Sequence, residues 1–301
     1  MESFDKFYRI FQKTLQNLYP EPKELENIFF LLTTHIFQCD KITILLRLSR
    51  KEQIDFVTYD KLIKKLWELK KNRPIQYVIG HTYFFGMKFI VNEKVFIPRQ
   101  ETEELVYWIL QDYKKNFHHH HDAYIQVFDI GTGSGCISIS LKKKKPEIVN
   151  IHAIDFDQEV LDIAKKNAKL HNVKISLKNM DILKEEIDPL IKRNKNYVHI
   201  IVSNPPYVKL SEKKILHPNI LQYEPYKALF VPDETPLIFY QSISFWIKKR
   251  LTGIVYIYFE INQFIYLDII NFLKKMGFLN IEIRKDLQGF FRMVRAVYYA
   301  K

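Results

Sequence analysis

Two short segments of the sequence combine residue types and spacings that suit chemistry, and the first is a glycine loop. Gly131, Gly133 and Gly135 fall within five residues, in a chain that has only 8 glycines. Glycine lets the backbone turn tightly and approach a ligand, and the N-terminus of a following helix favours electron-rich groups. The apolar residues 125–130 before the loop fit a strand, and residues 136–144 after it fit a helix. The loop therefore predicts a ligand site, whereas the alternative is a glycine-rich turn that binds nothing.

An acidic residue follows the loop where a ribose-binding group would stand. The next predicted strand ends at Asp155, with Phe156 and Asp157 after it, and a carboxylate there can accept hydrogen bonds from ribose hydroxyls. A dinucleotide site would have glycine where this chain has Cys136, and no Gly-Lys-Ser/Thr sequence for a nucleoside triphosphate is present. Asp129 and the Gly-x-Gly-x-Gly spacing instead resemble the S-adenosylmethionine (AdoMet) loop of class I methyltransferases.

This resemblance implies an AdoMet site built from several strand ends. In methyltransferases of this class the end of the third strand lies beside the adenine, which points to Asp181 and Ile182. The residues expected to bind AdoMet are Asp129, Gly131, Thr132, Gly133, Ser134, Gly135, Asp155, Phe156, Asp181, Ile182 and Asn204.

The second segment is the turn Asn204-Pro205-Pro206-Tyr207, which follows the apolar residues 199–202. Two prolines fix the backbone and remove two amide donors, which leaves carbonyls free to accept hydrogen bonds. Asn204 adds an amide oxygen as an acceptor, and Tyr207 adds an aromatic face. Such a turn can hold both hydrogens of a planar NH2 group while its nitrogen points at a sulfonium methyl. A rigid turn that merely ends a strand is the alternative.

The nitrogen of a planar NH2 group is a poor nucleophile because its lone pair is delocalised. Fixed acceptors stabilise the positive charge that grows on this nitrogen during methyl transfer, and positioning lowers the entropic barrier. The proton can leave after the transfer, so no strong base is required. We therefore expect Asn204, Pro205, Pro206 and Tyr207 to form the catalytic set.

Strand and helix patterns alternate from residue 125 onward, which implies a mostly parallel sheet covered on both faces. The predicted strands are 125–130, 149–156, 174–180, 198–203, 254–261, 280–285 and 292–299, and the predicted helices are 136–144, 158–171, 183–193, 236–250 and 263–276. Residues 286–291 are too few for a helical crossover, so the last strand should be antiparallel to its neighbour. Glu260 ends the fifth strand at the edge where ligands bind in open α/β folds, although a role at a helix start fits it equally.

Three regions are expected along the chain. Apolar residues at three- and four-residue steps in residues 1–72 predict a small all-α N-terminal domain. Its placement and its lack of catalytic motifs suggest that this domain binds the substrate. Residues 73–97 predict a β-hairpin linker, with strands at 77–80 and 83–91. Residues 98–301 are expected to form the methyltransferase domain. The fold class is therefore α/β, a Rossmann-like class I AdoMet-dependent methyltransferase with a seven-stranded sheet.

Bulk properties exclude several classes of protein. The net charge of +12 would suit a nucleic acid, but the lysines are scattered in pairs that fit solvated helix faces. Cys39 and Cys136 lack metal-ligand spacing, so neither a disulfide framework nor a zinc site is expected. The histidine tract 118–121 is interpreted as a solvated connector, and no metal site is predicted. The absence of a signal peptide and of a long apolar segment favours the cytoplasm.

Further segments resemble the PrmC/HemK family of protein-(glutamine) methyltransferases over nearly the whole chain. They are Pro74-Ile75-Gln76-Tyr77-Val78-Ile79-Gly80, Phe84-Phe85-Gly86, Phe96-Ile97-Pro98-Arg99-Gln100-Glu101-Thr102-Glu103, and Tyr223-Glu224-Pro225 with Ala228-Leu229. The resemblance implies methylation of the glutamine in the Gly-Gly-Gln motif of peptide chain release factors, with AdoMet as donor. No nucleic acid or membrane partner is expected, and the chain is expected to be a monomer. Gln100 replaces a proline common in the family, and Phe290 and Phe291 replace polar residues, so no role is assigned to their loop.

Two other functions stay open at this point. An adenine-amino methyltransferase acting on DNA or RNA shares the Asn-Pro-Pro-Tyr segment and suits the net charge, but it should carry a region that flips a base out of its stack. No basic recognition element of that kind is recognisable in the N-terminal helices. An inactive AdoMet-fold binding protein is disfavoured by the intact loop and turn. The N-terminal domain is hypothesised to grip the release factor away from the glutamine.

Overall fold

The computed structural model describes residues 2–117, 124–148, 150–184 and 197–300. The chain divides into two compact units. The N-terminal unit comprises Met1–His81 together with Leu216–Tyr223, and the sheet unit comprises Thr82–Ile215 together with Glu224–Lys301. Each unit is described by itself.

The N-terminal unit is built from amphipathic helices, as the sequence predicts. Its elements are β1 (Glu2–Ser3), α1 (Phe4–Leu15), α2 (Pro22–Phe37), α3 (Lys41–Ser49), β2 (Gln53–Ile54), α4 (Phe56–Lys70), α5 (Ile75–Ile79) and α9 (Pro218–Tyr223). Side chains of Ser3, Asp40 and Asp55 cap α1, α3 and α4 by accepting hydrogen bonds from backbone N–H groups in the first turn. The predicted apolar residues line a shared core, except for Trp67, which is exposed.

The strand predicted at residues 77–80 is wrong, because these residues belong to the short helix α5. Pro74 precedes the helix and Gly80 ends it with a left-handed φ of 77°, a pattern of start and stop residues that favours a helical turn. Ile75, Val78 and Ile79 pack into the core of the N-terminal unit, so burial of apolar side chains decides the conformation. The compact unit accordingly runs to His81 and includes residues that the sequence analysis assigned to the linker.

A hairpin does form directly after α5. Its strands are β3 (His81–Phe84) and β4 (Met87–Ile90), joined through Phe85 and Gly86. Both of these turn residues have positive φ, 52° and 74°, as a tight two-residue hairpin turn requires.

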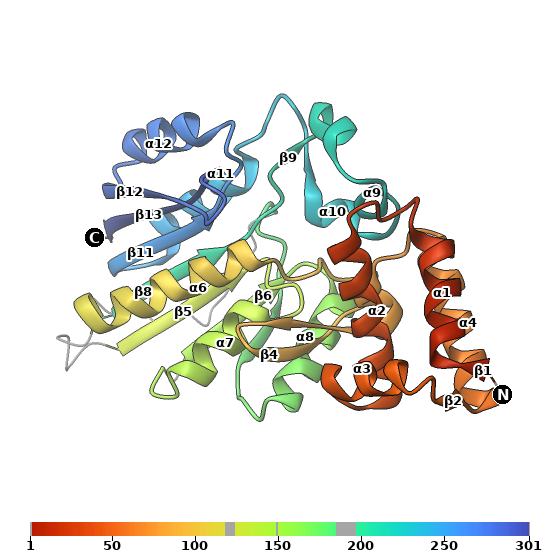
Figure 1. The fold of residues 1–301 in the computed structure, drawn as a ribbon. Helices are drawn as coiled ribbons and strands as arrows, with labels where there is room; N and C mark the ends of the chain where they lie inside the picture. The colour runs from red at the N-terminus through yellow and green to blue at the C-terminus, as the bar shows by residue number, and fades with distance from the viewer. Residues whose placement is uncertain (1, 118–123, 149, 185–196, 301) are drawn as a thin grey trace. The chain divides into compact units, whose positions relative to one another are not determined.

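The sheet unit contains a seven-stranded sheet in the order β12-β13-β11-β8-β5-β6-β7 (Figure 1). The strands are β5 (Tyr124–Ile130), β6 (Asn150–Asp155), β7 (Ser176–Asn179), β8 (Tyr197–Ser203), β11 (Gly253–Glu260), β12 (Leu279–Lys285) and β13 (Phe291–Ala300). Neighbours from β7 to β11 are parallel, whereas β13 is antiparallel to both β11 and β12. The seven predicted strands and the antiparallel last strand are confirmed, and the fold is that of a class I methyltransferase.

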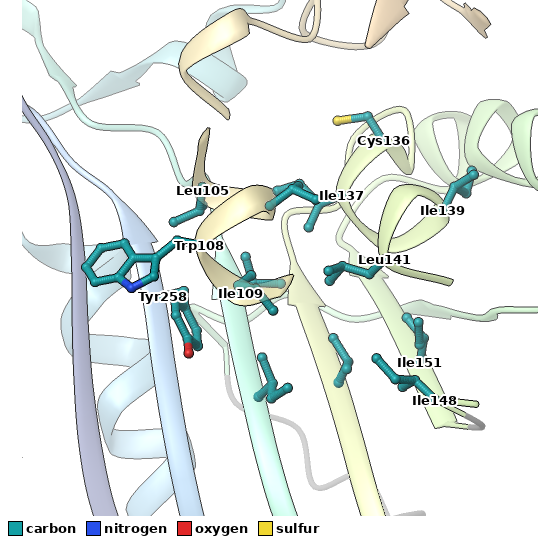
Figure 2. Packing of buried hydrophobic residues seen from close by; sticks show 14 of the residues in the cluster. Leu105, Trp108, Ile109, Cys136, Ile137, Ile139, Leu141, Ile148, Ile151 and Tyr258 are labelled. Atoms are coloured by element: carbon teal, nitrogen blue, oxygen red, sulfur yellow. The ribbon is translucent and has the colours of Figure 1, made fainter. Parts of the chain in front are cut away.

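Helices cover both faces of this sheet. One face carries α6 (Gln100–Asp112) and α7 (Cys136–Lys144), and Figure 2 shows Trp108 of α6 beside Tyr258 of β11 in that core. The opposite core contains residues of α11 (Ile238–Arg250) and α12 (Tyr266–Lys275). Successive residues of a strand serve opposite faces: Val127 packs in the first core and Phe128 in the second. The helix α8 (Gln158–Leu170) follows β6, as predicted.

Several features fall outside these predictions. The π-helical turn Tyr113–Phe117 follows α6, and the segment after the Asn-Pro-Pro-Tyr turn holds β9 (Val208–Lys209), the 3₁₀ turn Leu210–Ile215, α10 (Tyr226–Leu229) and β10 (Phe230–Val231). The strands β9 and β10 pair in parallel. Most of the helix predicted at 183–193 and the histidine tract 118–121 lie outside the described residues.

Within the described part of the chain, no single helix combines the length and apolarity needed to cross a membrane. The consecutive helices α2 and α3 reach those limits only when counted together, and the chain bends by 96° between them.

Candidate active site

The glycine loop is held from behind by Asp129. This carboxylate is fully buried at the end of β5, and its Oδ2 accepts hydrogen bonds from Thr132 Oγ1 at 2.7 Å and from Ser138 Oγ at 2.7 Å. The Ser138 backbone N–H, in the first turn of α7, donates to the same oxygen at 3.1 Å. Asp129 therefore fixes both ends of the loop and is directed away from the ligand side.

The conformation of the loop depends on its glycines. Gly133 has a φ of 56°, and a Cβ at this position would meet no atom within 4 Å, so the loop leaves open space there. Gly135 has a φ of 79°, and a Cβ there would come within 3.0 Å of Ile139 Cδ1 and 3.3 Å of Ala164 Cβ. Gly133 therefore leaves room on the cavity side of the loop, whereas the lack of a side chain at Gly135 allows α7 to pack against α8.

Asp155, at the end of β6, reaches the loop from the neighbouring strand. Its Oδ2 accepts a hydrogen bond from the backbone N–H of Gly133 at 3.0 Å, and the Ile154 carbonyl accepts from the N–H groups of Gly131 and Thr132. Burial raises the pKa of Asp155 to about 6, although the Gly133 and Asp157 N–H groups oppose the shift by stabilising the carboxylate. Asp155 is thus a carboxylate whose charge changes near neutral pH.

The Asn-Pro-Pro-Tyr turn stands at the end of β8, beside β5. Ser203 Oγ donates a hydrogen bond to the Ile130 carbonyl at 2.6 Å, which ties the start of the turn to the start of the glycine loop. The Asn204 amide donates through Nδ2 and keeps Oδ1 as an acceptor, and the carbonyls of Pro205 and Pro206 are acceptors as well. Three acceptors are consequently available within one short turn.

Side chains from distant parts of the sequence surround this turn. Asn204 Nδ2 donates to Thr102 Oγ1 at 3.1 Å, and Thr102 Oγ1 donates to Glu260 Oε2 at 2.7 Å. Glu260 Oε1 accepts a second hydrogen bond from the Tyr207 hydroxyl at 3.0 Å. Asn262 Nδ2 donates to the Tyr207 carbonyl at 3.1 Å. The turn is therefore fastened to the first turn of α6 and to the end of β11.

Burial changes the acidity of two groups in this network. It raises the pKa of Tyr207 well above its ordinary value, and the nearby Glu260 carboxylate adds to the shift. Burial also raises the pKa of Glu260, while the hydrogen bonds from Thr102 and Tyr207 oppose that shift by stabilising its ionised form. Tyr207 is accordingly a neutral phenol whose hydroxyl donates a hydrogen bond to Glu260.

A cavity of about 290 Å³ is lined by both the loop and the turn, a volume near the lower end of small-molecule sites. The four residues of the expected catalytic set line it. So do most of the expected AdoMet residues, namely Gly131, Thr132, Gly133, Ser134, Asp155, Phe156, Asp181, Ile182 and Asn204. Asp129 and Gly135 do not line it, because one is buried behind the loop and the other packs against α8.

An ion pair between a half-buried arginine and a buried glutamate lies next to segments that line the cavity. The Arg99 guanidinium pairs with Glu224, whose Oε2 also accepts a hydrogen bond from the Ile97 N–H at 3.4 Å. The segments on either side of the pair line the cavity through Phe96 and Tyr226. Gln100 is the first residue of α6, so the helix starts here without the proline common in the family.

Comparisons with known proteins agree with this geometry. A family model described as the methyltransferase small domain matches residues 114–222. A release factor glutamine methyltransferase of Flavobacterium psychrophilum is 39% identical over 292 residues, which cover 96% of this chain and 98% of that protein. The protein of the same name from Bacteroides thetaiotaomicron is 35% identical over 285 residues, with 95% and 96% covered. The chain belongs to the release factor glutamine methyltransferases.

A solved structure gives a further likeness at the level of the fold. The hMettl16 catalytic domain, in complex with a MAT2A 3′UTR hairpin, matches with a TM-score of 0.51, and 80% of this chain and 81% of that chain are covered. At 17% sequence identity this likeness shows the fold alone.

The residues of this methyltransferase fit AdoMet, the donor that its reaction requires. Ser134 Oγ, from a residue that lines the cavity, is buried and finds no hydrogen-bond partner among the described residues. The open space at Gly133 and the Asp155 carboxylate lie on the same side of the loop. Across the described chain no group of three or more His, Cys, Asp or Glu side chains could hold a metal ion.

Sequence reasoning assigned no role to Thr102, and it left the segment Glu260-Ile261-Asn262 between a ligand-side strand end and a helix start. Thr102 lies in a segment that resembles the family, but a threonine in the first turn of a helix carries no signal of its own. Glu260 ends β11 on the cavity side and does not start a helix, since α12 begins only at Tyr266. The position of Glu260 and Asn262 at the carboxyl end of a parallel strand indicated the ligand side of the sheet, but it did not predict their hydrogen bonds to Thr102 and Tyr207.

Proposed function

We propose that this chain transfers a methyl group from AdoMet to the side-chain amide nitrogen of the glutamine in the Gly-Gly-Gln motif of peptide chain release factors. The observation that carries the proposal is the set of three acceptors at the end of β8, Asn204 Oδ1 and the carbonyls of Pro205 and Pro206, on the wall of the cavity that the glycine loop also lines.

The glycine loop and the ends of β6 and β7 would hold AdoMet. Asp155 would accept hydrogen bonds from the ribose hydroxyls, and Phe156, Asp181 and Ile182 would lie beside the adenine. Ser134 Oγ, without a partner among the described residues, is available to a polar group of the ligand. Bound AdoMet supplies an electrophilic methyl on its sulfonium.

The turn would bind the glutamine and prepare its nitrogen. Asn204 Oδ1 and the Pro205 carbonyl would each accept one hydrogen of the glutamine NH2 group, which orients the nitrogen lone pair toward the methyl. The same acceptors stabilise the positive charge that develops on the nitrogen, and they cost no reorganisation because the prolines fix them. Tyr207 would pack against the planar amide, with its hydroxyl held by Glu260.

The relatives support a protein substrate over a nucleic acid. Both carry release factor glutamine methylation in their names, and both match over nearly their whole length. The net charge of +12 remains the reason to test a nucleic acid directly. We place the reaction in the cytoplasm.

A transfer assay tests the proposal. The full chain is incubated with AdoMet labelled in its methyl group and, in separate reactions, with a purified bacterial release factor, the same factor with its Gly-Gly-Gln glutamine replaced by alanine, and adenine-containing oligonucleotides. Label should appear only on the unchanged release factor. Label on the oligonucleotides, or equal labelling of the two release factors, would contradict the proposed substrate.

We further propose that the N-terminal unit contacts the release factor away from the glutamine. Phe56 and Val57, at the start of α4, are among its exposed apolar side chains. Replacing both with serine should raise the KM for a release factor while leaving methylation of a short Gly-Gly-Gln peptide unchanged. Leu170→Ser, an exposed apolar residue of α8, is the control and should affect neither substrate. An unchanged KM in the double variant would argue against contact at this surface.

A further inference from the structure

We propose that Thr102 and Glu260 are positioning residues that determine which end of the Asn204 amide faces the cavity. The inference rests on the proposed function, because it concerns the acceptor that Asn204 offers to the glutamine NH2 group. The three residues are far apart in the sequence: Thr102 and Asn204 are separated by 102 residues, and Thr102 and Glu260 by 158.

The direction of each hydrogen bond follows from counting donors and acceptors. Glu260 accepts the hydroxyl of Thr102 on Oε2 and the hydroxyl of Tyr207 on Oε1, so both of its carboxyl oxygens act as acceptors in this network. The single hydrogen of Thr102 is thereby used, so its oxygen has only lone pairs left for Asn204. Asn204 must then turn its NH2 group toward Thr102, and its Oδ1 is left as an acceptor on the opposite end of the amide.

This orientation matters because the two ends of an asparagine amide have nearly the same shape and opposite polarity. If the Asn204 amide were rotated by half a turn, its NH2 group would meet the NH2 group of a substrate glutamine, and two donors would face each other. The acceptor that stabilises positive charge on the reacting nitrogen would be lost as well.

The surroundings make the arrangement rigid. Thr102 and Glu260 are each only 2% exposed, so water does not compete for their hydrogen bonds. Thr102 lies in the first turn of α6 and Glu260 is the last residue of β11, so both belong to regular elements. The Tyr240 hydroxyl of α11 donates to the Glu260 carbonyl at 3.0 Å and fixes that strand end from the other face of the sheet.

The test uses the full chain with Thr102→Val, which keeps the shape of the side chain and removes its oxygen, and Thr102→Ser, which keeps the hydroxyl. In Thr102→Val we expect the kcat for release factor methylation to fall by about 10- to 100-fold. The Kd for AdoMet and the KM for the release factor should stay within about threefold of the values for the unchanged chain. Thr102→Ser should retain kcat within about threefold, because the chain of hydrogen bonds persists. Wild-type kcat in Thr102→Val, or an equal loss in both variants, would overturn the inference.

Two further measurements guard against misfolding and against failure of the proposed function. Glu260→Gln introduces a donor into the network and should also lower kcat, so a poorly folded Thr102→Val still leaves a test. In the chain labelled with ¹⁵N-asparagine, the Asn204 side-chain NH2 hydrogens should exchange with solvent more slowly in the unchanged chain and in Thr102→Ser than in Thr102→Val. Equal exchange would refute the orientation even if the release factor proved not to be the substrate. Absence of release factor methylation by the unchanged chain would refute the proposed function instead.

Discussion

The glycine loop and the Asn-Pro-Pro-Tyr turn stand at the ends of the neighbouring strands β5 and β8, but they are held in different ways. The loop is fixed by nearby residues: Asp129 binds Thr132 and Ser138, and Asp155 binds the Gly133 N–H from 22 residues away. The turn is fixed by Thr102 and Asn262, which lie 102 and 55 residues away from the groups that they bind.

The difference shows that this enzyme binds the methyl donor AdoMet and orients the Asn204 amide by separate structural means. A strand, a glycine loop and a helix form a local cradle for AdoMet, largely from backbone groups. Orientation of the Asn204 amide requires α6, which comes early in the sequence of the sheet unit, and β11, which comes late. Substitutions in the loop should therefore act on AdoMet affinity, and substitutions in the turn should act on turnover.

The largest effect is expected from Asn204→Ala. Loss of the amide oxygen removes an acceptor that stabilises charge on the reacting nitrogen, so kcat should fall by roughly 100- to 1000-fold. The Kd for AdoMet, measured by calorimetry, should change by less than about threefold, because one contact among many is lost. Turnover close to that of the unchanged chain would refute the role of Asn204 and remove the distinction between loop and turn.

Asp155→Ala should have the opposite signature. Removing a charged acceptor of two ribose hydroxyls should weaken AdoMet binding by about 10- to 100-fold. The kcat at saturating AdoMet should stay within a few-fold of the unchanged value. If the variant binds AdoMet normally but turns over slowly, Asp155 contributes to turnover, as the turn does, rather than to AdoMet binding.

The pKa of about 6 for Asp155 predicts that AdoMet affinity depends on pH. The ionised carboxylate is the form that accepts hydrogen bonds, so affinity should be full well above pH 6 and should fall as the pH drops through 6. Binding at pH 5 should be about tenfold weaker than at pH 8, since about one molecule in ten then carries the charge. In Asp155→Asn the side chain does not titrate, and calorimetry across this range should show little change in affinity.

The smallest effects separate two glycines within the loop. Both Gly133→Ala and Gly135→Ala place a side chain at positive φ, which should lower the free energy of unfolding by about 1 kcal/mol in Gly133→Ala. The loss should be larger in Gly135→Ala, because the added Cβ would also come within 3.0 Å of Ile139 Cδ1 and 3.3 Å of Ala164 Cβ. Only Gly133 lines the cavity, so AdoMet binding should weaken in Gly133→Ala and persist in Gly135→Ala. Denaturant unfolding and calorimetry measure the two quantities, and equal loss of affinity in both variants would show that Gly135 also serves the ligand.

Much of the fold could be predicted because its signals are local. Apolar alternation located all seven strands of the large sheet, and the short connection at residues 286–291 correctly required an antiparallel last strand. The prediction at residues 77–80 was wrong for a physical reason. A short apolar run fits a strand or a buried helical turn equally well, and packing against the other helices of the N-terminal unit decided it.

By itself the sequence determined the glycine loop, the acid at the end of β6 and the rigid acceptor turn, because glycine, proline and a strand end act through their immediate neighbours. Only the tertiary structure decided that Thr102 meets both Asn204 and Glu260, and that Asp129 faces away from the cavity. The direction of hydrogen bonds between side chains so far apart in the sequence depends on the order of the strands and on how α6 packs against the sheet. Those features arise from packing of the whole sheet unit, and no local pattern of residues specifies them.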